Sequence, residues 1–201
     1  MIKKECIIYI PFFIYSVMKN IFTYEQFLNE NKSEKSAIIL TGEGFQDQEL
    51  LQPKKSLEDE GVTVTIAGIE KKEVKAYNSD ETIDIEEYIG DLNPEDYDIL
   101  VLPGGKAPDK IRSSDVIIKF VKRFFDTGRP IAAICHGPQV LITAELVDGV
   151  TMTCYSDMKD ELIEAGANYV DKSLVIDGQF ITSREPKDLD EFCSAILSNI
   201  K

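Results

Sequence analysis

The stretch that most constrains the fold reads Ile131-Ala132-Ala133-Ile134-Cys135-His136-Gly137-Pro138-Gln139. Its first four residues are small or β-branched and apolar, which is typical of a buried strand, and a glycine and a proline are typical of the first turn of a helix. Cys135 therefore falls on a sharp bend between a strand and a helix. The stretch predicts an α/β fold with a nucleophile elbow at Cys135.

The bend surrounds Cys135 with groups that suit a nucleophile. Backbone N–H groups and the positive end of the following helix stabilise negative charge, so we expect them to favour the thiolate. His136 is the only histidine of the chain and is able to exchange a proton near neutral pH. A buried structural cysteine beside an unrelated histidine is the alternative. We favour nucleophilic catalysis because both residues fall on the elbow.

Length, charge and cysteine spacing exclude several classes of protein. The chain has 201 residues, enough for a single substantial core, and its formal net charge of −14 argues against a nucleic-acid partner. Its four cysteines are widely separated and the chain has one histidine, so we expect neither a zinc site nor an iron–sulfur cluster. Free thiols suit a reducing compartment, so we expect a cytoplasmic protein.

Two glycine motifs do not support a nucleotide cofactor. Gly42-x-Gly44 lacks the third glycine of a dinucleotide fingerprint, and Gly104-Gly105-Lys106 lacks the Ser or Thr and the spacing of a P-loop. The sequence therefore predicts no cofactor.

Residues 1–35 differ from the rest of the chain. The apolar run from Cys6 to Met18 is shorter than the roughly 20 residues that span a bilayer, Pro11 interrupts it, and no small-residue cleavage site follows. Three interpretations of this segment are open. It is a weak membrane or export signal, an apolar arm that packs on the body or on a partner subunit, or the translation of an upstream start codon, with Met18 as the true first residue. We favour the last two and expect no firm membrane association.

Residues 36–201 alternate between apolar runs and helical patterns, which predicts one doubly wound α/β domain, a mostly parallel sheet between helices. The predicted strands are Ala37–Thr41, Val62–Gly68, Ile99–Leu102, Ile131–Ile134, Tyr169–Val170, Leu174–Ile176 and Phe180–Thr182, with weak strand positions at Val74, Ile83 and Ile85. The predicted helices are Gln48–Glu60, Ser114–Thr127, the segment after Cys135, Lys159–Ala165 and Asp188–Ile200. Asp177-Gly178 predicts a hairpin between the last two strands.

Ligands of such a sheet bind beyond the carboxyl ends of its strands, where we expect three loops to meet. The first, Thr41–Glu49, brings Glu43, Asp47 and Glu49 to the start of a helix, although capping alone explains a residue such as Asp47. The second, Pro103–Asp109, contains two glycines that let backbone N–H groups approach a reacting oxygen. The third is the elbow itself.

Several separate motifs, in this order along the chain, resemble those of the ThiJ/PfpI superfamily, which has a flavodoxin-like fold related to class I glutamine amidotransferases. The resemblance covers about Ser36 to Lys201. It rests on Leu40-Thr41, Phe45–Leu50 with Pro53, Val101–Pro108, Ala133–Gln139, Tyr155 and Ser183-Arg184. The chain looks closest to the PfpI branch, whose members are described as intracellular cysteine peptidases and, alternatively, as glyoxalases or deglycases acting on methylglyoxal and its adducts.

The resemblance implies a role for each matching residue. It makes Cys135 the nucleophile and His136 the acid/base, and it places the carboxyl group of Glu49 against the cysteine sulfur, where it tunes the pKa of the thiol. The backbone N–H groups of Gly105 and His136 match the donors of an oxyanion hole. The resemblance also places three residues in the substrate pocket: Gly104, Gln46 and Tyr155.

Two positions depart from the PfpI pattern. Asp109 stands where PfpI-type proteins place a glutamate that reaches the histidine of a neighbouring subunit, and it is one methylene shorter. That role implies a homodimer or a larger homo-oligomer. Gln46 replaces another glutamate, which removes a charge near the mouth of the pocket.

The sequence therefore predicts an enzyme with a covalent Cys135 intermediate and a small reactive carbonyl or a peptide as substrate. The alternative is a non-enzymatic, stress-related redox sensor or chaperone in which Cys135 oxidises to a sulfinic acid stabilised by Glu49. Cys154 and Cys193 are interpreted as structural. Arg184 either orients a carboxylate or pairs with an acid such as Glu185.

Overall fold

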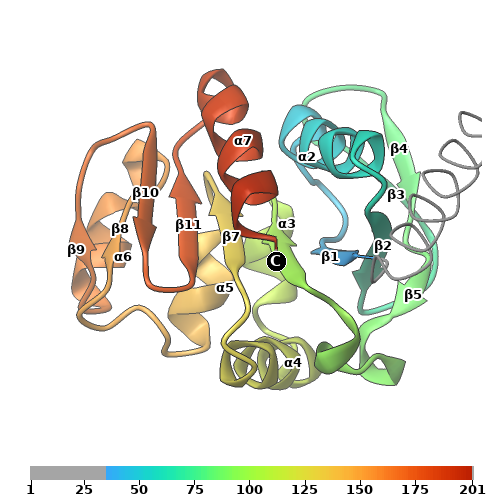
Figure 1. Ribbon diagram of the computed structural model, residues 1–201, viewed down its shortest axis with the longest axis horizontal. Coiled ribbons are helices and arrows are strands. Elements are labelled where there is room, and N and C mark those ends of the chain that lie inside the picture. Colours follow the sequence, from blue (N-terminus) through green and yellow to red (C-terminus); the bar gives the residue numbers. More distant parts are fainter. Residues whose placement is uncertain (1–34, 201) are drawn as a thin grey trace, which may run out of the picture. The chain divides into compact units, whose positions relative to one another are not determined.

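The computed structural model describes residues 35–200, and the predictions for residues 1–34 lie outside this range. Its main sheet has seven strands in the order β10-β11-β7-β6-β1-β2-β5 (Figure 1). The strands are β1 Ser36–Leu40, β2 Thr63–Gly68, β5 Glu87–Tyr88, β6 Ile99–Leu102, β7 Ile131–Ile134, β10 Leu174–Asp177 and β11 Phe180–Ser183. All neighbours pair in parallel except β10 and β11. The predicted mostly parallel sheet is confirmed, as is the hairpin.

Helices cover both faces of this sheet. The α-helices are α2 Asp47–Asp59, α3 Ala107–Ile111, α4 Asp115–Asp126, α5 Pro138–Thr143, α6 Lys159–Glu164 and α7 Leu189–Asn199. Four 3₁₀ turns add η1 Ile89–Asp91, η2 Pro94–Asp96, η3 Ser156–Met158 and η4 Pro186–Asp188. Two small sheets pair β3 Glu73–Lys75 with β4 Thr82–Asp84, and β8 Thr151–Met152 with β9 Asn168–Tyr169. Within residues 35–200, no helix is long and apolar enough to cross a membrane.

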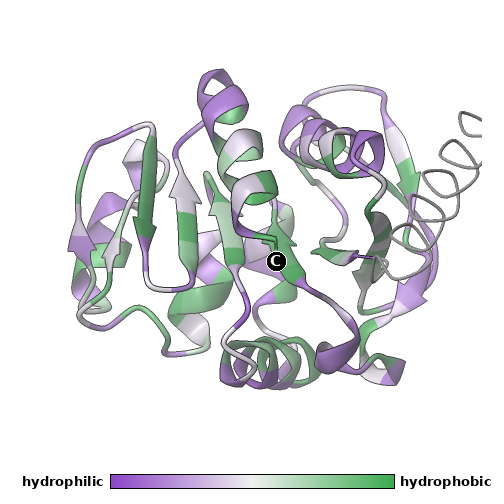
Figure 2. Cartoon of the chain, in the orientation of Figure 1, coloured by the Kyte–Doolittle hydropathy of each residue, from purple (hydrophilic) through white to green (hydrophobic). Residues whose placement is uncertain are grey.

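The central strands are buried on both sides, which explains why they are apolar without alternation. In β6, Leu100 and Leu102 pack on the side of α4 and α5, whereas Ile99 and Val101 pack on the side of α2 and α7. Figure 2 shows the hydrophobic colour concentrated along these inner strands and on the helix faces that cover them. Each large apolar side chain removed from water contributes roughly 1.5–3 kcal/mol. This two-sided core fixes the sheet edge where β1, β6 and β7 end.

The structure differs from the sequence-based expectation mainly in its shortest elements. Helix α3, of five residues, was not predicted because it is too short to show a helical period and follows directly on a Gly-Gly turn. The two-residue strands β5 and β8 were missed for the same reason. Ile85 is not in a strand, so that prediction is wrong; its side chain is buried in the core between β4 and β5.

Candidate active site

Cys135 occupies a strained bend between β7 and α5. Its φ of 62° lies in the left-handed region, which residues other than glycine rarely adopt. The N–H of Cys135 donates to the carbonyl of Ser183 at 3.1 Å, and its own carbonyl accepts from the N–H of Tyr155 at 3.1 Å. Neighbouring segments therefore hold Cys135 in a conformation that the residue alone would not keep.

Two glycines let the surrounding segments approach this bend. A Cβ on Gly137 would lie 2.2 Å from the carbonyl oxygen of Leu102. A Cβ on Gly104 would lie 2.5 Å from the Glu49 carboxylate and 2.7 Å from the Cβ of Cys135. Only residues without a side chain fit at these two positions, so the elbow, the end of β6 and the start of α2 meet in direct contact.

Glu49 is the buried acid of the site. It lies in the first turn of α2, is 0% exposed, and accepts the N–H of Gly104 at 3.0 Å. Burial raises the pKa of Glu49 to about 7, and its contact with the Cys135 thiol opposes that rise. The helix cap that orients Glu49 is the side chain of Gln46, which accepts the N–H of Glu49 at 2.7 Å.

The protonation of Cys135 reflects a competition between its neighbours. Burial and the negative charge of Glu49 raise the pKa of Cys135, whereas hydrogen bonds from the N–H groups of Gly105 and His136 lower it. The raising effects are larger, which corrects the expectation that the elbow alone favours a thiolate. The reason is that a Cys135 thiolate would be buried beside the carboxylate of Glu49, and the two negative charges would repel each other. A proton on Glu49 removes this repulsion, so Cys135 and Glu49 together carry one negative charge more easily than two.

His136 lies between the sulfur and a second acid. Its Nδ1 is 3.2 Å from the Cys135 Sγ, and its Nε2 is 3.1 Å from Oδ1 of Asp157. The ring also packs against that of Tyr155, with 5.5 Å between the centroids. Asp157, in η3, was not predicted as a site residue. Each nitrogen of the imidazole therefore has a polar partner in the same chain, the Cys135 sulfur for Nδ1 and the Asp157 carboxylate for Nε2.

A cavity of about 640 Å³ opens above Cys135. Its size suits a small molecule or a single side chain. The lining combines seven predicted site residues with others from the same loops: Gln46, Glu49, Gly105, Asp109, Cys135, His136, Tyr155, Tyr77, Lys106, Lys110, Gln139, Asp157, Glu185 and Pro186. Gly104 is buried beside Glu49 and does not line it.

Comparison with known proteins assigns this arrangement to a family. Residues 35–199 match the DJ-1/PfpI family. The chain belongs to this family. Deglycase PfpI of Pyrococcus furiosus is 36% identical over 152 residues, which cover 76% of this chain and 91% of that protein. The putative cysteine protease YraA of Bacillus subtilis is 37% identical over 169 residues, covering 84% and 99%. The crystal structure of Drosophila melanogaster DJ-1beta superposes with a TM-score of 0.78 at 30% identity and covers 84% of this chain and 91% of that one.

In this DJ-1/PfpI chain, Asp109 lies at the rim of the cavity, at the start of α3. Its Oδ1 accepts a hydrogen bond from Nη2 of Arg112 at 2.7 Å, and Arg112 also pairs with Glu161. Asp109 thus has a cationic partner in its own chain. Its action across a subunit interface stays a prediction.

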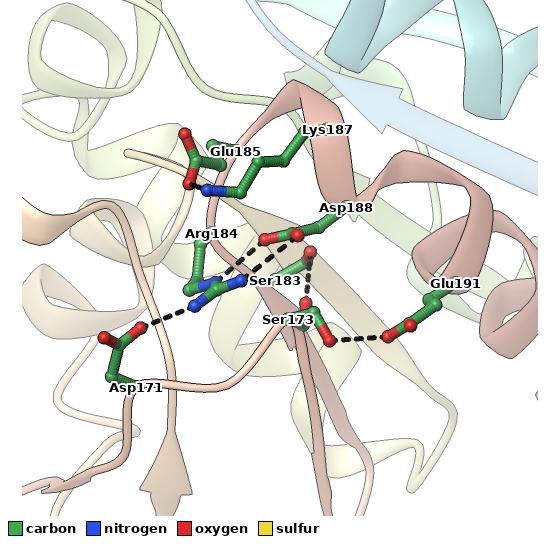
Figure 3. A network of polar contacts seen from close by, with 8 residues as sticks. All are labelled: Asp171, Ser173, Ser183, Arg184, Glu185, Lys187, Asp188 and Glu191. Atoms are coloured by element: carbon green, nitrogen blue, oxygen red, sulfur yellow. Dashed lines mark hydrogen bonds and ion pairs between the residues drawn. The ribbon is translucent and has the colours of Figure 1, made fainter.

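Arg184 supports one wall of the cavity. Figure 3 shows its guanidinium between two carboxylates, Asp188 at 2.8 and 3.2 Å and Asp171 at 2.7 Å. Glu185 pairs instead with Lys187. Arg184 therefore pairs with acids, as one of the two interpretations predicted, and these acids are Asp188 and Asp171. Because Glu185 and Pro186 line the cavity, this network holds that wall in place.

Sequence reasoning missed Asp157, Tyr77 and the two lysines of the lining. Asp157 stands two residues after Tyr155, in a segment with no strand or helix period to orient it. The signal present was an acid two residues after a predicted pocket residue. Tyr77 carried no motif, because a distant loop brings it to the cavity. Lys106 and Lys110 lie in and directly after the predicted loop Pro103–Asp109, but they were given no role.

Proposed function

We propose that this DJ-1/PfpI family member is a hydrolase-type enzyme that uses Cys135 as a nucleophile on small reactive carbonyl compounds, as a glyoxalase or deglycase acting on methylglyoxal and its adducts. The observation that carries the proposal is the 3.2 Å contact between Cys135 Sγ and His136 Nδ1 at a strained elbow beneath a cavity. The deglycase name of the Pyrococcus furiosus relative supports the same substrate class.

The first step forms a thiohemiacetal. Nδ1 of His136 takes the thiol proton, the sulfur of Cys135 bonds to the aldehyde carbon, and the electron pair of the C=O bond moves to oxygen. The N–H groups of Gly105 and His136, which point to the sulfur, are placed to stabilise that oxygen. The imidazolium returns its proton to the oxygen.

The later steps need no external oxidant or reductant. With methylglyoxal, a proton moves from the former aldehyde carbon to the neighbouring carbon through an enediol, which leaves a lactoyl thioester on Cys135. Water then attacks the thioester carbonyl and releases lactate and the thiol. The sum is methylglyoxal plus water giving lactate. His136 is the group in contact with sulfur that carries the protons between these steps.

A cysteine peptidase is the second candidate, because a Bacillus subtilis relative is named a putative cysteine protease. Thiol attack on a peptide carbonyl would form a thioester on Cys135 in the same place. Cys135 is only 7% exposed, so a small aldehyde reaches it more readily than the backbone of a folded protein. This burial is the reason for preferring carbonyl chemistry.

The test measures methylglyoxal consumption and lactate formation by the purified protein beside Cys135→Ala and Cys154→Ala. Burial raises the pKa of Cys154 to about 12, and this thiol does not line the cavity, so it is a matched control. We expect turnover to disappear in Cys135→Ala and to persist in Cys154→Ala. Casein cleavage that depends on Cys135, without lactate, would favour the peptidase. No turnover, with Cys135 oxidised readily by peroxide, would favour the sensor or chaperone alternative.

A further inference from the structure

We propose that Asp157 positions the imidazole of His136 from within the same chain, holding the proton on Nε2 so that the lone pair of Nδ1 faces the Cys135 sulfur. The inference rests on the proposed roles of Cys135 and His136. It assigns the acid of a cysteine–histidine–acid set to a residue that the sequence motifs did not indicate.

The contacts of His136 carry the first step. A neutral imidazole has one N–H and one lone pair, and the hydrogen bond at one nitrogen decides which is which. A carboxylate oxygen attracts an N–H group and repels a lone pair, so Oδ1 of Asp157, 3.1 Å from Nε2, favours the proton on Nε2. Nδ1 is then the acceptor, 3.2 Å from the sulfur whose proton has to be removed.

Backbone contacts fix the segment that carries Asp157, although the side chain of Asp157 is 63% exposed. On one side, the N–H of Tyr155 donates to the carbonyl of Cys135 at 3.1 Å, which ties this segment to the elbow. On the other, Met158 is buried, and its N–H donates to the carbonyl of Tyr155 at 3.0 Å. Among residues 35–200, His136 is the one side chain that forms an ion pair with the Asp157 carboxylate.

The other acid proposed for His136 is engaged elsewhere. Asp109 lines the same cavity, but its Oδ1 is 2.7 Å from Nη2 of Arg112. Breaking that contact would leave the half-buried Arg112 with Glu161 as its remaining acid. Within one chain, therefore, the histidine already has a carboxylate, and Asp109 already has a cation.

The experiment uses the fact that His136 is the only histidine. In tag-free, ¹⁵N-labelled protein, long-range ¹H–¹⁵N correlations of the imidazole show directly which nitrogen carries the proton. At a pH where the ring is neutral, we expect the Nε2–H form in the native protein. Asp157→Ala should raise the Nδ1–H form from a minor to a comparable population, and Asp157→Glu should restore the native pattern. Asp160→Ala, an exposed acid three residues away with the same change in charge, is the control.

An unchanged tautomer in Asp157→Ala would overturn the inference, as would a change caused by Asp109→Ala instead. The result does not depend on turnover, so it separates failure of this inference from failure of the proposed function. Where lactate formation is measurable, Asp157→Ala should lower kcat roughly tenfold and change KM by less than about twofold. The reason is that the imidazole of His136 loses its orientation, whereas the substrate pocket is unchanged. Equal loss in Asp160→Ala would point to a structural effect and overturn the assignment.

Discussion

Two acids contact Cys135 and His136, and they differ in origin, exposure and the residue that each contacts. Glu49 comes from the first turn of α2, is 0% exposed, and lies against the Cys135 thiol. Asp157 comes from η3, has a side chain that is 63% exposed, and contacts the imidazole of His136. A buried charge interacts strongly with its surroundings, and an exposed one is screened by water.

The difference separates control of protonation from control of orientation. Burial raises the pKa of Glu49 to about 7 and leaves that carboxyl close to half-protonated near neutral pH, where it governs the charge on the neighbouring sulfur. Asp157 is too exposed to exert a comparable field. Its effect depends on where its carboxylate oxygen lies, 3.1 Å from Nε2 of His136, and not on the strength of its charge. Glu49 influences how many protons the site binds, and Asp157 influences which nitrogen of His136 carries the proton.

The largest expected effect concerns stability. Because the pKa of Glu49 rises from 4.5 in the unfolded chain to about 7 in the folded one, the folded state binds more protons between these values. Its stabilising contribution is complete below pH 4.5 and is lost as the pH rises through 7. Glu49→Gln cannot ionise, so it should be more stable than the native protein by about 3 kcal/mol at pH 8, with no such gain at pH 4. Urea unfolding at several pH values measures this.

The matched control for that experiment is Glu60→Gln, at the other end of the same helix and exposed. It should leave the pH dependence of unfolding unchanged, as should Asp157→Asn. An equal gain in all three variants would mean that net charge, and not burial of Glu49, causes the effect. The contrast between the two acids would then fail.

A smaller effect concerns thiol reactivity. The Glu49 carboxylate raises the pKa of Cys135, and Glu49→Gln removes that charge while keeping a group that hydrogen bonds. Alkylation of Cys135 by iodoacetamide at pH 8 should therefore become roughly tenfold faster, since one pKa unit changes the thiolate fraction tenfold. Asp157→Asn should change the rate less than about threefold. Mass spectrometry of the labelled peptide separates Cys135 from Cys154 and Cys193. Faster labelling in Asp157→Asn than in Glu49→Gln would reverse the assigned roles.

The sequence pattern placed Glu49 at the start of a helix and the family resemblance implied its contact with Cys135, whereas Asp157 was missed, for a physical reason. Glu49 lies at the start of a helix whose pattern is readable, and β6 and the elbow strand Ile131–Ile134 are continuous apolar runs, so their places in the fold followed from local residues. Asp157 lies in a one-turn segment, where the side-chain direction depends on contacts with a distant part of the chain.

The same limit explains what was misjudged about Cys135. Backbone N–H groups at the bend were expected from the sequence, and those of Gly105 and His136 do lower the pKa of the thiol. How far burial and a neighbouring carboxylate raise it depends on how closely α2 approaches the elbow. Gly104 permits that close approach, because it lies between Glu49 and Cys135, and this contact appears only in three dimensions.

The smallest effect tests how Glu49 is held. Gln46 caps α2 through its side-chain oxygen, which accepts the N–H of Glu49 at 2.7 Å. Gln46→Ala should destabilise the fold by about 1–2 kcal/mol, since it leaves a buried helix N–H without its acceptor. Ser114, at the same position before α4, makes no capping hydrogen bond through its side chain, so Ser114→Ala should cost far less. If Gln46→Ala also speeds alkylation of Cys135, the cap fixes the Glu49 carboxyl against the thiol; an unaltered rate would mean that Gly104 alone holds it there.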